Sequence, residues 1–239
     1  ILSGLVGSEM CIRDRTGNYL RKNIYDKLNV MNENYHRGYF IQMDHLDMLA
    51  NSIDGINKGY KQIRKMLEIG VHEFQLSKRL SRLNGDQLLR IYALYKNDVQ
   101  REKLQRMGFG QQEMQRINDL LPEQAREFAD KLVQYLSTSY YESVNSVYSY
   151  LNDVNLQHIS DYFPTITERE SIGAQELLEG NFSRIFDAET SPALRERVDT
   201  ESDVDILKDF TSVVDTHFQN MEKYKACLLY TSDAADDTP

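Results

Sequence analysis

The densest cluster of potential metal ligands in this sequence is Asp44, His45 and Asp47. Residues three or four apart share one side of a helix, so this cluster could present two ligands to a divalent cation. The His-Glu pair at 72–73 begins like the H-E-x-x-H zinc motif, which needs a second histidine four residues after the first. Leu76 occupies that position. We therefore expect a solvated polar face at the first cluster and no zinc motif at the second.

An acidic run, D-T-E-S-D-V-D from Asp199 to Asp205, alternates carboxylates as a calcium-binding loop does. The EF-hand requires glycine at the sixth position of its loop and a bidentate glutamate at the twelfth. Val204 and Phe210 occupy those positions. We therefore expect a solvated acidic loop in front of a capped helix, and no calcium site.

Three other groups of residues could take part in chemistry. The Gly-Phe-Gly sequence at 108–110 follows a predicted helix rather than a strand, which favours a turn over a phosphate-binding loop. Glu168 and Glu170 fall in an expected exposed turn, where nothing sets the geometry that acid–base catalysis needs. The tyrosines between 140 and 150 could stack on bases, but no basic groove interleaves with them. We predict no catalytic, cofactor-binding or metal-binding residue.

The composition argues against several classes of protein. The formal net charge is −9 and no run of basic residues occurs, which disfavours binding to the phosphates of nucleic acids. No apolar run approaches the roughly 18–20 residues that a membrane span needs. Only 4 prolines and 12 glycines occur in 239 residues, which leaves room for long helices.

The two ends of the chain read as translated adaptor DNA. CLLYTSDAAD from Cys227 and LVGSEMCIRD from Leu5 are translations of the two strands of a transposase-type sequencing adaptor. We therefore expect 1–15 and 227–239 to be adaptor artefacts, and 16–226 to be a piece of a longer protein. Both cysteines, Cys11 and Cys227, fall in the artefacts. The natural part then has no thiolate for a zinc site or for nucleophilic catalysis.

Apolar residues recur every three to four positions along most of the chain, which predicts amphipathic helices. The longest stripe runs from Met43 to Phe74 with the spacing of a coiled-coil seam or of one arm of a helical hairpin. Asn84-Gly85 is a strong helix stop. We predict a long helical hairpin or coiled-coil-like arm over 16–84, and no strand.

Shorter helices are expected to follow this arm. A multi-helix bundle is predicted over 85–159, with Gly108 as a left-handed C-cap and Pro122 in the first turn of a helix. The composition changes at Asp161, which predicts an irregular arm over 160–203. A truncated helix is predicted over 204–226. The fold class is all-α: long antiparallel helices plus several short helices, with an irregular extended arm.

Several segments in a fixed order carry a resemblance. They are GDQLLRIYALYKN from Gly85, LQRMGFGQQEMQRINDLLPEQ from Leu104, NDVNL from Asn152, DYFP from Asp161 and FTSVVDTHFQNMEKYKA from Phe210. Together they resemble large virion-associated proteins of tailed bacteriophages, including internal or ejected proteins and giant polyvalent proteins. The resemblance covers most of 80–226. It implies a helical structural or ejection-related region of the virion, of a kind that can be delivered into the host cell. Catalytic modules would lie elsewhere on the parent chain.

We therefore predict a noncatalytic structural or interaction fragment of a large phage virion protein. Its partners would be the remainder of its own chain and other virion proteins, with no direct nucleic acid binding and no cofactor. The alternatives are an incomplete enzyme domain, whose active site lies in flanking sequence and uses His45 or His217, and a cellular coiled-coil adaptor. Two apolar stripes are the candidate interaction surfaces, with core packing the more common role of such stripes: Met43, Leu46, Ile53, Ile56, Tyr60, Ile63, Leu67, Leu207, Phe210, Val214, Phe218 and Met221.

Overall fold

The computed structural model describes residues 28–76, 80–165 and 208–236. These residues are mostly helical, and the predicted all-α class is confirmed. A helix over 28–51 comes first. The elements after it are α2 (Gly59–Met66), β1 (Val71–Gln75), β2 (Leu80–Asn84), α3 (Gly85–Leu94), α4 (Asp98–Met107), α5 (Gln111–Leu120), α6 (Glu123–Tyr135), the π-helix η1 (Leu136–Tyr140), α7 (Tyr141–Asn152) and α9 (Phe210–Asp236).

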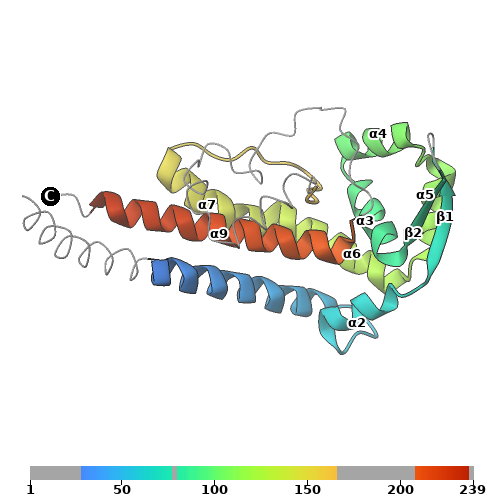
Figure 1. Ribbon diagram of the computed structural model, residues 1–239, viewed down its shortest axis with the longest axis horizontal. Coiled ribbons are helices and arrows are strands. Elements are labelled where there is room, and N and C mark those ends of the chain that lie inside the picture. The colour runs from blue at the N-terminus through green and yellow to red at the C-terminus, as the bar shows by residue number, and fades with distance from the viewer. Residues whose placement is uncertain (1–27, 77–79, 166–207, 237–239) are drawn as a thin grey trace, which may run out of the picture.

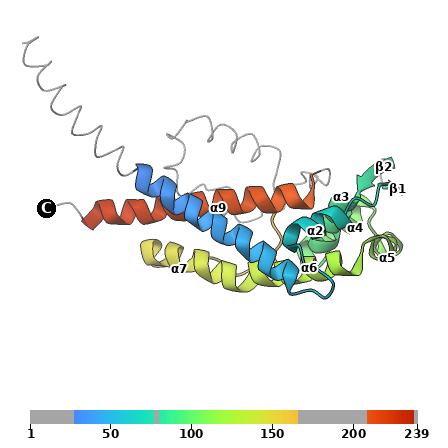
Figure 2. The ribbon, with the colours of Figure 1, turned by 90° about the horizontal axis from the view of Figure 1, so that it is seen from below.

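The long helices lie side by side along the molecule (Figure 1). Helix 28–51 and α9 run antiparallel, and the α6–η1–α7 segment packs along α9 as well (Figures 1 and 2). The shorter helices α2 to α5 and the strands gather at one end of this layer, next to the start of α9 (Figure 1). No helix in the described part of the chain is both long and apolar enough to cross a membrane.

The long stripe from Met43 to Phe74 does not form one helix, which corrects the prediction of a continuous arm. The first helix ends at residue 51, a loop follows over 52–58, and α2 ends at Met66. Gly55, Gly59 and Gly70 adopt positive φ angles of 83°, 59° and 87°. Glycine enters this left-handed region without the steric cost that other residues bear, so the chain turns at these positions.

The segment 71–84 is a β-hairpin, and the expectation of helix there is wrong. Strands β1 and β2 pair antiparallel, with Val71 opposite Asn84 and Gln75 opposite Leu80. Phe74 and Leu83 point into the core, while their neighbours along each strand are more exposed. The leucines near the turn are spaced by three and four residues, so their spacing fits a helix as well as a strand pair.

The junctions between α3 and α6 follow local capping rules. Asn84 and Gln87 form a capping box at the start of α3. Gly108 ends α4 with φ 110°, the left-handed cap that the sequence predicts. Pro122 stands as the N-cap immediately before α6, one residue ahead of the predicted position. The α6–α7 connection is a single winding through η1 with no break in the helical backbone.

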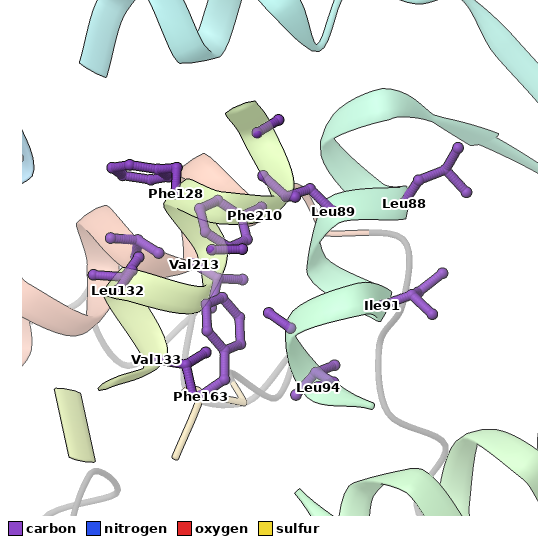
Figure 3. Packing of buried hydrophobic residues seen from close by; sticks show 14 of the residues in the cluster. Leu88, Leu89, Ile91, Leu94, Phe128, Leu132, Val133, Phe163, Phe210 and Val213 are labelled. Carbon is purple, nitrogen blue, oxygen red and sulfur yellow. The ribbon is translucent and has the colours of Figure 1, made fainter. Parts of the chain in front are cut away.

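One hydrophobic core draws on residues from both ends of the described chain. In Figure 3, Phe210 and Val213 of α9 lie between α6, which provides Phe128 and Leu132, and α3. Phe163, from the segment after α7, stacks on Phe210 with the ring centroids 5.0 Å apart. The predicted parts 16–84, 85–159 and 204–226 therefore contribute to a common core. Most of the predicted irregular arm over 160–203 lies outside the described residues.

Candidate functional site

Glu222 of α9 is a buried carboxylate, 3% exposed, at the centre of the helical layer. It accepts hydrogen bonds from Gln42 Nε2 at 3.2 Å, from Tyr140 OH at 3.2 Å and from Lys225 Nζ at 3.1 Å. These donors come from helix 28–51, from η1 and from α9 itself. A buried charge is tolerated when it is paired and hydrogen-bonded, and Glu222 meets both conditions.

The groups around Glu222 are themselves engaged. Tyr135 OH donates to Gln42 Oε1 at 2.7 Å, and Lys225 Nζ donates to Ser143 Oγ at 3.0 Å. The network thus joins four segments: helix 28–51, α6, η1–α7 and α9. We call Gln42, Tyr135, Tyr140, Glu222 and Lys225 the Glu222 cluster.

The backbone of helix 28–51 comes close to this cluster at Gly38. A β-carbon built at Gly38 would lie 2.2 Å from Glu222 Oε2 and 3.0 Å from Glu222 Cδ. Real β-carbons do not approach other atoms this closely, so the position requires glycine unless the carboxylate moves. Gly38 lies inside the continuous helix 28–51 and permits the close approach of this helix to the carboxylate of Glu222.

Both tyrosines of the cluster act as neutral donors or packing groups at ordinary pH. Burial, followed by the negative charge of Glu222, raises the pKa of Tyr135 to about 12. The same two causes raise the pKa of Tyr140 well above its usual value. Tyr140 belongs to the five-residue π-helix η1. Such insertions occur often at functional positions because they redirect side chains within a helix.

A second polar contact joins the same two long helices at Asp215, about two turns nearer the start of α9 than Glu222. Tyr39 OH donates to Asp215 Oδ1, and Gln219 Nε2 donates to Asp215 Oδ2 at 3.0 Å. Burial is the main cause that raises the pKa of Tyr39 to about 12, and the hydrogen bond to Asp215 adds to it. Helix 28–51 is therefore fixed to α9 by two separate polar contacts in addition to apolar packing.

A surface groove of about 800 Å3 lies at the other end of the layer, between α2 and the starts of α3 and α9. Three basic residues of α2 line it: Lys61, Arg64 and Lys65. Three acidic residues also line it: Glu68, Asp86 and Asp209. The positive and negative charges balance, so the groove shows no preference for an anion or a cation.

Asp86 has a structural task in this groove. Its carboxylate accepts from Thr211 N at 3.1 Å and from Thr211 Oγ1 at 2.6 Å, so it caps the N-terminus of α9 from another helix. Burial is the largest cause that raises the pKa of Asp86, and the bonds from Thr211 oppose the shift. The interaction ties the start of α9 to the start of α3.

The outward side of helix 28–51 carries large apolar side chains. Val30, Phe40, Ile41 and Met48 are 55%, 62%, 53% and 64% exposed. The helix buries Leu46 and Ala50 on its other side, against the core. We call Val30, Phe40, Ile41 and Met48 the outward apolar face. In Figure 2 the helix crosses in front of α9 and α7, and none of the described elements covers it from that side.

Of Asp44, His45 and Asp47, which we expected to form a solvated polar face, the last two make separate structural contacts. The ring of His45 stacks on Tyr135 with centroids 4.2 Å apart, and Asp47 Oδ1 accepts from Tyr60 N at 2.8 Å. Asp44 is exposed. Within the described ranges, no three His, Cys, Asp or Glu side chains gather as a metal site would require.

The remaining sequence candidates take different places. His72 Nε2 lies 3.2 Å from the Ile69 carbonyl oxygen, and His217 is buried with its ring near those of Tyr140 and Tyr162. The glutamates at 168 and 170 and the acidic run at 199–205 lie outside the described residues.

The predicted interaction stripes face inward. Of the twelve candidates, Leu207 lies outside the described residues, and Met43 and Tyr60 are partly buried against the core. The others belong to the buried core itself: Leu46, Ile53, Ile56, Ile63, Leu67, Phe210, Val214, Phe218 and Met221. The prediction of interaction surfaces at these nine positions is corrected: they provide the apolar contacts that hold the fold together.

Glu222 and Gly38 escaped the sequence analysis. Glu222 falls within an amphipathic helix pattern, and glutamates are common on helix surfaces. Phe218 and Met221 belong to the apolar stripe of the same helix, and their positions four and one residues earlier are the sequence signal that position 222 also lies near the core side. The contact with Gln42 spans 180 residues of sequence and has no local signature.

Comparison of the chain with family models, curated proteins and solved structures finds no match.

Proposed function

We propose that this chain is a noncatalytic, helical interaction region of a large virion-associated protein of a tailed bacteriophage. The phage assignment rests on the order of the segments from Gly85 to Ala226 that resemble such proteins. The region contributes a rigid helical layer and an exposed helix face to assembly. Its partners are other parts of its own chain and other proteins of the particle.

The observation that carries the interaction role is the outward apolar face of helix 28–51. Phe40 and Met48 are each more than 60% exposed, although the same helix has a separate, well-packed inner face. A helix that is apolar on two opposite sides offers one side to its own core and the other to a partner.

The state of the buried titratable groups favours a structural role over catalysis. Glu222 accepts from three donors, and Lys225 bonds to both Glu222 and Ser143. A general acid or base must reach a substrate proton within hydrogen-bonding distance. The Glu222 cluster uses its donors and acceptors to join helices, which is what a structural network requires.

The alternatives predict different surfaces. A coiled-coil adaptor that self-associates through the 43–74 stripe would need Leu46, Ile53 and Ile63 to be accessible, and each is at most 3% exposed. An enzyme completed by flanking sequence would need His45 or His217 at an open site. His45 is stacked on Tyr135, and His217 is 7% exposed.

Mass spectrometry of purified phage particles tests the proposal. The source DNA is first extended on both sides of this reading frame, and a phage that carries the frame is propagated and purified. The proposal expects a parent protein several times longer than this chain, and peptides from 28–165 within the particle. A short, complete enzyme gene across either junction, or particles that lack these peptides, would refute it.

A further inference from the structure

The residues at the middle of the outward apolar face follow an order of charge that is complementary to itself. Phe40 and Ile41 lie at its middle, with Arg37 one turn before and Asp44 one turn after them. All four side chains are exposed. Neither Arg37 nor Asp44 forms an ion pair within the described residues. The helix therefore presents a cation, two large apolar groups and an anion in a line.

This order is self-complementary when two copies of the helix meet antiparallel. A two-fold axis that passes between positions 40 and 41 places Phe40 of one copy against Ile41 of the second copy. The same axis brings Arg37 of each copy opposite Asp44 of the other, which makes two equivalent ion pairs. A parallel arrangement in register would place Arg37 against Arg37, so charge selects the antiparallel one.

The ends of the face extend the apolar contact. Val30 and Met48 lie on the same outward side as Ile41, since they are 11 and 7 residues from it and these separations are close to whole numbers of turns. In the antiparallel pair, Met48 of one copy falls within about one turn of Val30 of the second copy. Each copy thus covers exposed apolar groups of the other along several turns.

We propose that helix 28–51 is a homodimerisation surface, in which the outward apolar face pairs antiparallel with a second copy of this chain. The inference does not depend on the phage assignment. A partner of different sequence would not require this face to complement itself, whereas a second copy does. A contact made by one helix face is small, so the dimer belongs to the weak and concentration-dependent class.

Charge reversal combined with mixing tests the proposal on the full chain. Sedimentation equilibrium would be measured in reducing buffer up to about 1 mM, because a small interface gives weak association. We expect the unaltered chain to show a monomer–dimer equilibrium. R37D faces Asp44 of its own second copy with like charge, and D44R faces Arg37 likewise. Each variant alone should dissociate with a dissociation constant raised roughly tenfold or more.

An equimolar mixture of R37D and D44R provides the decisive result. In the mixed pair, the aspartate at position 37 of R37D meets the arginine at position 44 of D44R, and Asp44 of R37D meets Arg37 of D44R. Both ion pairs therefore form, the first with its charges reversed and the second as in the unaltered chain. The double variant R37D/D44R should dimerise for the same reason. Both positions are exposed, and circular dichroism verifies that each variant keeps its helices.

Three outcomes would overturn the inference. The first is an unaltered chain that stays monomeric throughout the concentration range. The second is a dimer that either single reversal leaves unchanged, which would place the interface elsewhere. The third is loss of association in both single variants without recovery in the mixture or in the double variant.

Discussion

Gly38 lies so close to the carboxylate of Glu222 that a β-carbon at position 38 would stand 2.2 Å from Oε2. Glu222 has little freedom to retreat, since it is 3% exposed and accepts from Gln42, Tyr140 and Lys225. The distance between helix 28–51 and α9 is therefore set by a glycine on one helix and a pinned carboxylate on the other. This relationship makes the energetics of the helical layer testable.

Gly38→Ala should destabilise the protein, although replacement of glycine by alanine inside a helix ordinarily stabilises it by about 1 kcal/mol. The added methyl group forces apart a packed contact, a change that typically costs about 1–3 kcal/mol. Urea unfolding monitored by circular dichroism gives the difference in the free energy of unfolding.

The matched control for that experiment removes the carboxylate of Glu222, which is the group that the added methyl would meet. In a Glu222→Ala background, Gly38→Ala should become neutral or stabilising, because the carboxylate oxygen that it would meet is gone. An equal loss of stability in both backgrounds would mean that the close approach to Glu222 does not govern the position.

Glu222→Ala should lower the free energy of unfolding by about 3–5 kcal/mol, because it leaves the largely buried Lys225 without its carboxylate partner. Glu127→Ala is a fitting comparison, since Glu127 also pairs with a lysine on its own helix, Lys131, but at the surface. That change should cost no more than about 1 kcal/mol. Similar losses in the two variants, measured by chemical denaturation, would contradict the assignment of Glu222 as the centre of a buried network.

Asp86 should give the protein a pH-dependent stability that Asp86→Asn lacks. Burial raises the pKa of Asp86 in the folded chain, so the folded state binds its proton more tightly than the unfolded state. Ionisation therefore costs stability as the pH rises from about 4, the usual aspartate range, through the raised pKa. The stability of the unaltered chain relative to Asp86→Asn should fall from pH 4 to pH 7.

Asparagine keeps an oxygen acceptor for the amide of Thr211, so the difference between the two proteins isolates the charge. Thermal or urea unfolding across the pH range provides the measurement. A difference that stays constant would mean that folding does not shift the pKa of Asp86. A difference that grows in favour of the unaltered chain toward neutral pH would mean that folding stabilises the carboxylate as an anion, and either result contradicts the prediction.

Arg116 should anchor the β-hairpin to α5. Its Nη1 donates to the Glu73 carbonyl oxygen at 2.9 Å, and its guanidinium lies 4.7 Å from the ring centroid of Phe74. Arg116→Ala removes both contacts and should speed amide hydrogen exchange in β1 and β2 severalfold. Arg101→Ala on helix α4 should leave hairpin exchange unchanged, because Arg101 pairs with Asp98 and lies over the Tyr95 ring. An Arg116→Ala protein with unaltered exchange in both strands would rule out this anchor.

Local rules predicted much of the helical structure. Gly108 ends its helix with the left-handed backbone expected of it. Asn84-Gly85, predicted to stop a helix, instead ends strand β2 and begins helix α3. The apolar positions from Leu46 to Leu67 face inward as their period demands, even though glycines divide the stretch. These features depend on neighbours within a few residues, which a single sequence displays directly.

The β-hairpin and the Glu222 cluster depend on longer-range information. Leu76 and Leu80 are compatible with a helix or a strand pair, and packing of Phe74 near Phe109 accompanies the second choice. Whether an apolar stripe is core or docking surface depends on which other helices exist to cover it. Phe40 and Ile41 precede the apolar stripe that begins at Met43, so the sequence pattern does not predict that they form an exposed apolar surface.

The wide separation of Gln42 and Glu222 along the chain has a consequence for biosynthesis. At about 5–20 residues per second, a ribosome needs roughly 10–40 s to translate the 180 residues between them. Until α9 leaves the exit tunnel, helix 28–51 lacks one of the partners that cover its inner side, and apolar groups on both of its sides are open to solvent. The nascent chain is therefore a natural client for holdase chaperones during this interval, and slower translation lengthens the exposure.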